Sequence, residues 1–159
     1  MMTNLNIRSA NADDAENLAL MVEALLGEIM DGIGSPVFNF NGDDTRLRLR
    51  QFLDQGNYIV FIAEQRNAEA IGFIALTESH ALYAEGAFGI IPEFFVRPHF
   101  RSQQVGLRLL EQAKAYGHSR GWKRLEVTTP PLPQFDKTLA FYQREGFAVT
   151  GGRKLKALL

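Results

Sequence analysis

The sequence predicts a mixed α/β fold, in which a central twisted sheet of about seven strands is flanked by four helices. Two observations lead to this prediction. Short apolar runs typical of strands alternate along the chain with longer segments in which apolar residues recur at helical spacing. Glycine and proline stand between many of these segments, where turns and helix ends are expected. A length of 159 residues suits one domain, so we expect a single domain over residues 1–159.

Seven segments have the pattern of strands. The Glu85-Gly86 pair predicts a hairpin turn between the third expected strand, which begins at residue 70, and the fourth, which begins at residue 88. The third strand is expected to end at residue 77 or to continue to residue 83. Gly151-Gly152 predicts a second hairpin between the last two segments. The expected strands are residues 5–8, 58–63, 70–77, 88–96, 125–129, 147–150 and 154–158.

Four segments have the pattern of amphipathic helices. We expect Asn11 or Asp13 to cap the first and Asp43 or Asp44 to begin the second. Glycines that follow the last two segments predict where those helices end. The expected helices are residues 11–29, 43–53, 103–119 and 135–144.

Composition argues against several classes of function. The net charge is −1, so the chain as a whole does not attract nucleic acid, and attraction to a phosphate must be local. There is no cysteine, and the three histidines lack metal-ligand spacing, so we expect neither a thiolate nucleophile nor a metal. The first residues are unlike a secretory signal, and no apolar run approaches the roughly 18 residues of a membrane helix. We therefore expect a cytoplasmic protein with no membrane partner.

The segment 93–110 has the features of an anion-binding site. An apolar strand ends at Val96, a short basic turn follows, and a helix then begins without a strong side-chain cap. Such a helix start leaves backbone N–H groups unpaired and carries about half a positive charge. We therefore predict that a phosphorylated group binds here. Three arginines add positive charge to the segment: Arg97, Arg101 and Arg108.

Two short motifs lie about forty residues apart. The first is Arg101-Ser102-Gln103-Gln104-Val105-Gly106, and the second joins Phe141-Tyr142 to Gly146-Phe147. In this order, and with the predicted succession of strands and helices, they resemble the Arg/Gln-x-x-Gly-x-Gly/Ala loop and the Phe-Tyr-x-x-x-Gly-Phe ending of the GNAT superfamily of N-acetyltransferases. The resemblance covers almost the whole chain and implies the GNAT fold.

The resemblance implies acetyl transfer from acetyl-CoA to a primary amine, directly within a ternary complex. A strand would hold the pantetheine arm through its main chain, and the loop amides would hold the pyrophosphate. Gln104 stands where the family has its first loop glycine; its N–H can still donate if the position avoids a conformation open only to glycine. The implied residues are Phe94, Phe95 and Val96 for pantetheine, and Arg101, Ser102, Gln103, Gln104, Val105, Gly106 and Leu107 for the pyrophosphate.

Two residues are candidates for the proton transfers. By resemblance, Tyr142 is the acid that protonates the departing thiolate of CoA; the alternative is a half-buried aromatic with one ordinary hydrogen bond. Glu93, or a water, would deprotonate the acceptor ammonium; the alternative is a structural carboxylate paired with a lysine or arginine. The Val96 N–H would hold the oxyanion. We expect no acyl-enzyme, because there is no cysteine and no serine in a nucleophile motif.

The sequence does not identify the acceptor. A small amine and a peptide N-terminus both fit, and by resemblance the loop 31–44 shapes the acceptor pocket. The family's frequent dimers leave a homodimer open beside a monomer. The alternative function is a non-catalytic GNAT-like module that binds acyl-CoA or serves dimerisation.

Overall fold

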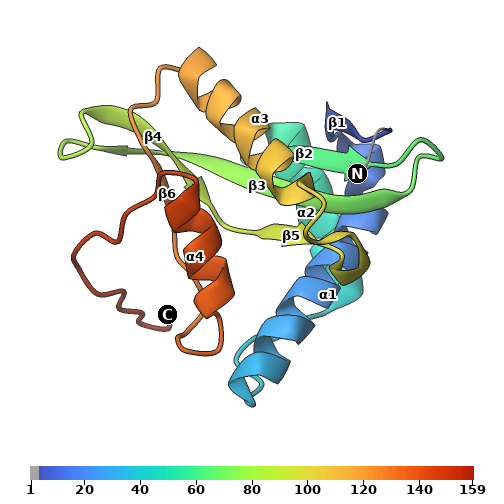
Figure 1. Ribbon diagram of the computed structural model, residues 1–159, viewed down its shortest axis with the longest axis horizontal. Helices are drawn as coiled ribbons and strands as arrows, with labels where there is room; N and C mark the ends of the chain where they lie inside the picture. Colours follow the sequence, from blue (N-terminus) through green and yellow to red (C-terminus); the bar gives the residue numbers. More distant parts are fainter. Residues whose placement is uncertain (1–3) are drawn as a thin grey trace. The chain divides into compact units, whose positions relative to one another are not determined.

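The computed structural model describes residues 4–159 and divides them into two compact units, one that ends at Thr128 and one that spans Thr129–Leu159. Figure 1 shows the order of the elements. The strands are β1 (Asn6–Ser9), β2 (Ile59–Glu64), β3 (Ala70–Ala81), β4 (Gly86–Ile91), β5 (Phe94–Val96) and β6 (Leu125–Val127). The helices are α1 (Ala15–Ile33), α2 (Gly42–Gln55), α3 (Val105–Ser119) and α4 (Asp136–Arg144), with short 3-10 helices η1 (Ala12–Asp14) and η2 (Pro98–Phe100).

The six strands belong to the first unit and form one mixed sheet. Strands β1 to β4 are antiparallel neighbours in sequence order, and β6 pairs with β4 in parallel. Strand β5 pairs with Gly72–Ile74 of β3, whereas β4 pairs with Thr77–Ala81 farther along β3. Strands β4 and β5 are therefore two successive segments along the same edge of β3. The predicted mixed fold is confirmed, with six described strands in place of about seven.

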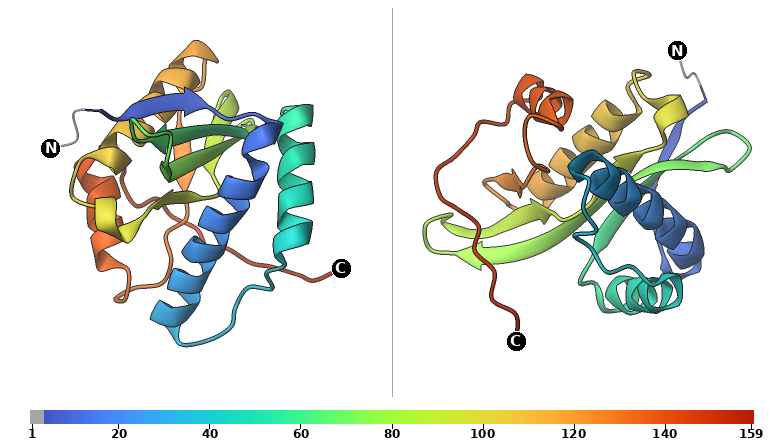
Figure 2. Two further views of the ribbon diagram at one scale, coloured as in Figure 1. Left: turned by 90° about the vertical axis from the view of Figure 1, so that its right-hand side faces the viewer. Right: turned by 90° about the horizontal axis from the view of Figure 1, so that it is seen from below.

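Helices α1 and α2 cover one face of the sheet, and α3 covers the other (Figure 2). Strand β2 is buried on both faces, which explains its dense apolar sequence. Val60 and Ile62 belong to the core on the side of α1 and α2. Phe61 points the opposite way, and its ring meets that of Tyr116 on α3 with centroids 5.9 Å apart.

The prediction of one strand over residues 88–96 is wrong, because β4 ends at Ile91 and β5 begins at Phe94. Pro92 has no N–H for a strand ladder, so pairing is interrupted there. The Glu93 carbonyl still accepts from the N–H of Ala75 on β3, at 2.9 Å. Strand β6 accompanies β4 only at Gly89–Ile91. In the part of the chain that the structure describes, the edge of β5 away from β3 therefore has no strand partner.

Two helix starts bear on the predicted caps. Asn11 caps the 3-10 helix η1 that leads into α1: its side chain accepts from the Asp13 N–H and its own N–H donates to Asp14, both at 2.9 Å, whereas α1 itself follows Asp14 without a side-chain cap. Helix α2 is capped by Asn41, which accepts from the Asp44 N–H at 3.0 Å. The predicted start of α2 at Asp43 or Asp44 is thus slightly late. Both aspartates lie in the first turn, where their charge favours the helix dipole.

The second unit contains α4 and an extended tail. Helix α4 is followed by Gly146 with φ +94°, and the Phe147 N–H returns to the Tyr142 carbonyl at 3.0 Å. The predicted terminal hairpin is wrong, because residues 147–150 and 154–158 form no strand. Leu155 is 91% exposed. A hairpin of two short strands alone would bury too little apolar surface to be stable, which explains why this segment is an extended tail and not the predicted hairpin.

Substitution of Gly89 by alanine should lower the free energy of unfolding by about 1–3 kcal/mol. A Cβ at this position would overlap the indole ring of Trp122, which cannot easily move because its Nε1 donates to Glu78 at 2.7 Å. Urea unfolding measures the change. Gly27→Ala on α1 is the matched control: a Cβ added there would have no atom within 4 Å, so this variant should gain about 0.5–1 kcal/mol. Equal stability of the two variants would contradict the packing argument.

Candidate active site

Helix α3 begins as the sequence predicted, without a side-chain cap. Its N-cap residue is Gln104, and no side chain accepts from its first turn. The first hydrogen bond inside the helix runs from the Arg108 N–H to the Gln104 carbonyl, at 3.0 Å. The N–H groups of Val105, Gly106 and Leu107, in the first turn of α3, thus have no helix carbonyl one turn back to donate to, and they carry the positive end of the helix dipole. This is the geometry of an anion-binding helix start.

The loop before α3 contains two residues in the left-handed region. Ser102 has φ +64°, and Gln104 has φ +66° with ψ +12°. This region favours glycine but is open to other residues at a cost of about 1–2 kcal/mol. The conformation is therefore not one that only glycine adopts, and the N–H of Gln104 is retained. The cost also explains why a glycine is favourable at this position.

Replacement of Gln104 by glycine should therefore stabilise the protein, by about 0.5–1 kcal/mol once the greater freedom of glycine in the unfolded chain is included. Thermal and urea unfolding measure the gain. Gln103→Gly is the control, since Gln103 is not among the residues with positive φ and should lose stability on the same change. A loss of stability in both variants would contradict the assigned conformation of Gln104.

Arg101 connects this loop to α1 and to β5 through hydrogen bonds. Its Nη1 and Nη2 atoms donate to the two carboxylate oxygens of Glu28 at 2.6 and 2.7 Å, and its Nε donates to the Val96 carbonyl at 2.8 Å. The ion pair lowers the pKa of Glu28 and raises the pKa of Arg101. The Arg101 N–H donates to the Pro98 carbonyl at 3.2 Å. A phosphate contact of Arg101 stays a prediction; its contacts here position the loop.

The other two arginines of the segment also bind backbone carbonyls. Arg97 donates through Nε to Ala70 at 3.1 Å, and Arg108 donates through Nη1 to Leu5 at 3.3 Å. Both contacts are with neighbouring strands or their ends, not with the loop. Attraction of an anion thus rests mainly on the amides of the loop and of the first turn of α3.

Strand β5 directs alternate backbone groups to its two edges. The Arg97 N–H donates to the Ile71 carbonyl of β3 at 2.8 Å, so Arg97 and, two residues earlier, Phe95 direct their backbone toward β3. The backbone groups of Phe94 and Val96 therefore face the edge that lies away from β3. Of the three residues predicted to hold a pantetheine arm, these two direct their main chain to that edge, where the Val96 carbonyl already accepts from Arg101 Nε.

Glu93 lies at the break between β4 and β5 and is half-buried. Its Oε1 accepts from the hydroxyl of Tyr58 at 2.9 Å. Burial raises the pKa of the Glu93 carboxyl, and the hydrogen bond from Tyr58 partly opposes that shift. Burial and the nearby carboxylate also raise the pKa of Tyr58. The partner of Glu93 is thus a tyrosine, whereas a purely structural carboxylate was expected to pair with a lysine or arginine. The raised pKa suits a proton acceptor near neutral pH.

Tyr142 belongs to the second unit, where its side chain is only 5% exposed. Its ring makes edge contacts with Phe141 and Phe147, with centroids 5.5 and 5.2 Å apart. Burial raises the pKa of its hydroxyl, which therefore stays protonated at neutral pH. A protonated hydroxyl is the form that a general acid requires.

Sequence reasoning missed Tyr58 and Glu28. Tyr58 follows Gly56-Asn57 at the start of β2, and nothing local distinguishes it from a core aromatic. Glu28 is one of several acidic residues of α1, and its partner is 73 residues away. Only the pairing of distant elements identifies either contact.

Metal ligands and membrane-spanning helices are two further features that bear on function. Within residues 4–159, no group of three histidine, aspartate or glutamate side chains is arranged to hold a metal ion. None of the helices described in the structure combines the length and the apolar character needed to cross a membrane.

An uncapped helix start thus lies beside the edge of β5 that has no strand partner among the described residues, in a mixed sheet split at β4 and β5. The family model of the acetyltransferase (GNAT) domain matches residues 56–149. The chain therefore belongs to the GNAT superfamily of N-acetyltransferases and is an acetyltransferase. Members of this family use acetyl-CoA.

Similar proteins agree with this assignment. The chain is 29% identical over 143 residues to the uncharacterised N-acetyltransferase YhfO of Bacillus subtilis, covering 90% of this chain and 89% of that protein. It is 28% identical over 159 residues to the aminoalkylphosphonate N-acetyltransferase of Salmonella typhimurium, covering 99% and 94%. A solved "predicted acetyltransferase with acetyl-CoA" from Clostridium acetobutylicum has the same fold, with a TM-score of 0.75, 17% identity and 96% coverage of each chain.

Proposed function

We propose that this chain transfers an acetyl group from acetyl-CoA to a primary amine, directly and without an acyl-enzyme. The observation that carries the proposal is the uncapped start of α3, preceded by two left-handed residues and by the open edge of β5. An anion-binding turn beside an unpaired strand edge suits a ligand that joins a pyrophosphate to an amide-containing arm.

The residues of this segment suit the two parts of CoA. The pyrophosphate would accept hydrogen bonds from the N–H groups of residues 102–107, among which Gly106 leaves room for close approach. The pantetheine arm carries amides that match the backbone groups of Phe94 and the N–H of Val96, since the Val96 carbonyl already accepts from Arg101 Nε. Acetyl-CoA itself supplies the activated thioester.

The proton transfers are assigned to two side chains. Glu93, directly or through a water, takes the proton of the acceptor ammonium, and its raised pKa supports this role. Tyr142 gives its proton to the departing thiolate, and its buried, protonated hydroxyl supports this role. The Val96 N–H stabilises the negative charge that develops on the thioester oxygen.

The acceptor is a primary amine, of a small molecule or of a peptide N-terminus. The Salmonella relative is an aminoalkylphosphonate N-acetyltransferase, which supports a small amine. A cytoplasmic location, a single domain over residues 1–159 and a homodimer stay predictions.

The test is an assay of free CoA. The protein is mixed with acetyl-CoA and a panel of small amines and peptides, and the released thiol is followed with a chromogenic reagent. We expect turnover with at least one amine. Binding of CoA in calorimetry without turnover over the whole panel would favour the acyl-CoA-binding module, and failure to bind CoA would contradict both functions.

A further inference from the structure

Helix α2 carries three arginines, and only one of them has an acidic partner among the described residues. Arg46 pairs with Asp43 on the same helix, at 3.0 Å. Arg48 and Arg50 are exposed, and in the part of the chain that the structure describes neither makes an ion pair. A surface arginine is often simply solvated, so the surroundings of each side chain decide whether it has a role.

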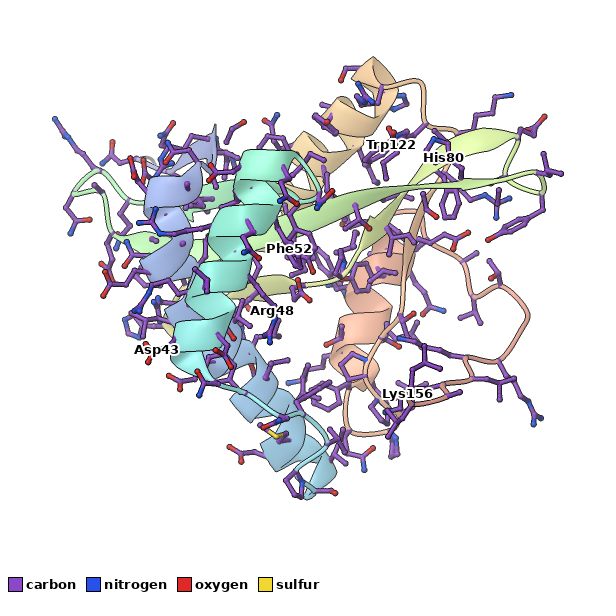
Figure 3. The ribbon with its side chains drawn as sticks, turned by 180° about the vertical axis from the view of Figure 1, so that it is seen from behind. Asp43, Arg48, Phe52, His80, Trp122 and Lys156 are labelled. Carbon is purple, nitrogen blue, oxygen red and sulfur yellow. The ribbon has the colours of Figure 1, made fainter. Side chains whose placement is uncertain are left out.

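Arg48 shares one side of α2 with Phe52. The two residues are four apart, which places Arg48 one turn earlier on the same side, about 6 Å along the axis. Figure 3 shows both side chains along that side of α2, with Asp43 toward the other side. Arg50 lies about 200° around the helix from Arg48, so it projects elsewhere.

Contacts between side chains connect the Arg48 side of α2 to Glu93. The Phe52 ring packs on the Tyr58 ring with centroids 4.9 Å apart, and the Tyr58 hydroxyl donates to Glu93 at 2.9 Å. Arg48, which makes no ion pair among the described residues, thus precedes Phe52 by one turn of α2, and the rings of Phe52 and Tyr58 continue from there to the half-buried carboxylate of Glu93. A molecule that lies along these rings meets a positive group at one end and a proton acceptor at the other.

We propose that the acceptor amine also carries an oxyanion group, a carboxylate or a phosphonate, which Arg48 binds while the amine lies at Glu93. This inference rests on the proposed function, because it assigns the acceptor of that same reaction. A guanidinium is suited to the task, since its planar donors match an oxyanion in a bidentate pair. Arg48 would then determine which amines are acetylated, without taking part in the chemical step.

The test compares amines of similar size with and without the anion. Values of kcat/KM are measured for 2-aminoethylphosphonate, β-alanine and propylamine, with the wild-type protein, Arg48→Gln and Arg50→Gln. For the wild type we expect kcat/KM to be about 10- to 100-fold higher for at least one of the two anionic amines than for propylamine. Arg48→Gln should abolish this preference, and Arg50→Gln should retain it. Melting temperatures check that both variants fold.

The outcomes separate this inference from the proposed function. Turnover of propylamine equal to or faster than that of the anionic amines would overturn the role of Arg48 and leave the acetyltransferase intact. Equal loss of the preference in Arg48→Gln and Arg50→Gln would also overturn it, because it would indicate a general effect of surface charge. Absence of CoA release with every amine would contradict the proposed function, and this inference with it.

Discussion

Glu93→Gln should lower kcat/KM by about 10²- to 10⁴-fold, the usual contribution of a general base. Glutamine keeps the size of the side chain and can still accept from the Tyr58 hydroxyl, but it cannot take the proton of an ammonium. CoA binding should be unchanged, because the predicted CoA contacts lie on β5 and at the start of α3. The free-CoA assay and calorimetry measure the two quantities. A loss of less than about tenfold would assign the proton transfer to water.

The pH dependence provides a second check on Glu93. Only the ionised carboxylate can accept a proton, so kcat/KM should fall as the pH decreases through the raised pKa of Glu93. The Tyr58 hydroxyl donates to this carboxylate and lowers its pKa, so Tyr58→Phe should move the acidic limb of the profile to higher pH. A limb that stays in place in Tyr58→Phe would show that another group controls it.

Stability should change in the opposite sense to activity in Glu93→Gln. Because burial raises the pKa of Glu93 in the folded protein, the fold opposes the ionised form, and the wild type loses stability as the pH rises through that pKa. The variant should therefore melt at an equal or higher temperature than the wild type under mildly alkaline conditions. The difference should shrink in acid, where both side chains are neutral. A lower melting temperature at every pH would indicate a structural role instead.

Tyr142→Phe should lower kcat by about 10²- to 10⁴-fold, because it removes the hydroxyl that protonates the thiolate. Phenylalanine keeps the ring and its edge contacts with Phe141 and Phe147. Binding of CoA should persist, and the melting temperature checks that the variant folds. Single-turnover measurements separate the chemical step from product release.

The matched control for Tyr142→Phe is Tyr116→Phe. Tyr116 lies on α3 beyond its first turn and packs through its ring against Phe61 and Trp122, and it is not among the residues assigned to CoA. This variant should retain nearly wild-type turnover. If the two variants lose activity equally, the loss reflects packing, and the role of Tyr142 as an acid is contradicted.

Much of the fold could be predicted because its signals are local. Helical spacing of apolar residues found all four helices, and the Glu85-Gly86 turn found the hairpin of β3 and β4. The break at Pro92 was also signalled locally, since proline lacks the N–H that a continuous strand needs. The prediction of a terminal hairpin was wrong for a different reason. Alternation of apolar and polar residues indicates that a segment can form a strand, but it does not show whether a neighbouring sheet is available for pairing.

The candidate site was only partly predictable. The uncapped start of α3 follows from the residues around Gln104, whereas the left-handed conformations of Ser102 and Gln104 were found only in the structure. The contacts of Arg101 with Glu28 and of Tyr58 with Glu93 join residues 73 and 35 positions apart. Such pairs depend on the packing of α1 against β5 and on the pairing of β2 and β5 with the two edges of β3, which no local pattern encodes. The proposed role of Arg48 likewise depends on the packing of Phe52 of α2 against Tyr58.

The most direct test of the central claim is a titration of the ¹⁵N-labelled protein with CoA, followed by assigned amide resonances. The account predicts that the largest shifts occur at residues 102–107 and at Phe94 and Val96, with little change at the amides of the turn between β3 and β4. Saturable shifts confined to that turn or to α2, with residues 102–107 unmoved, would contradict the assignment of the α3 start and the β5 edge as the CoA site.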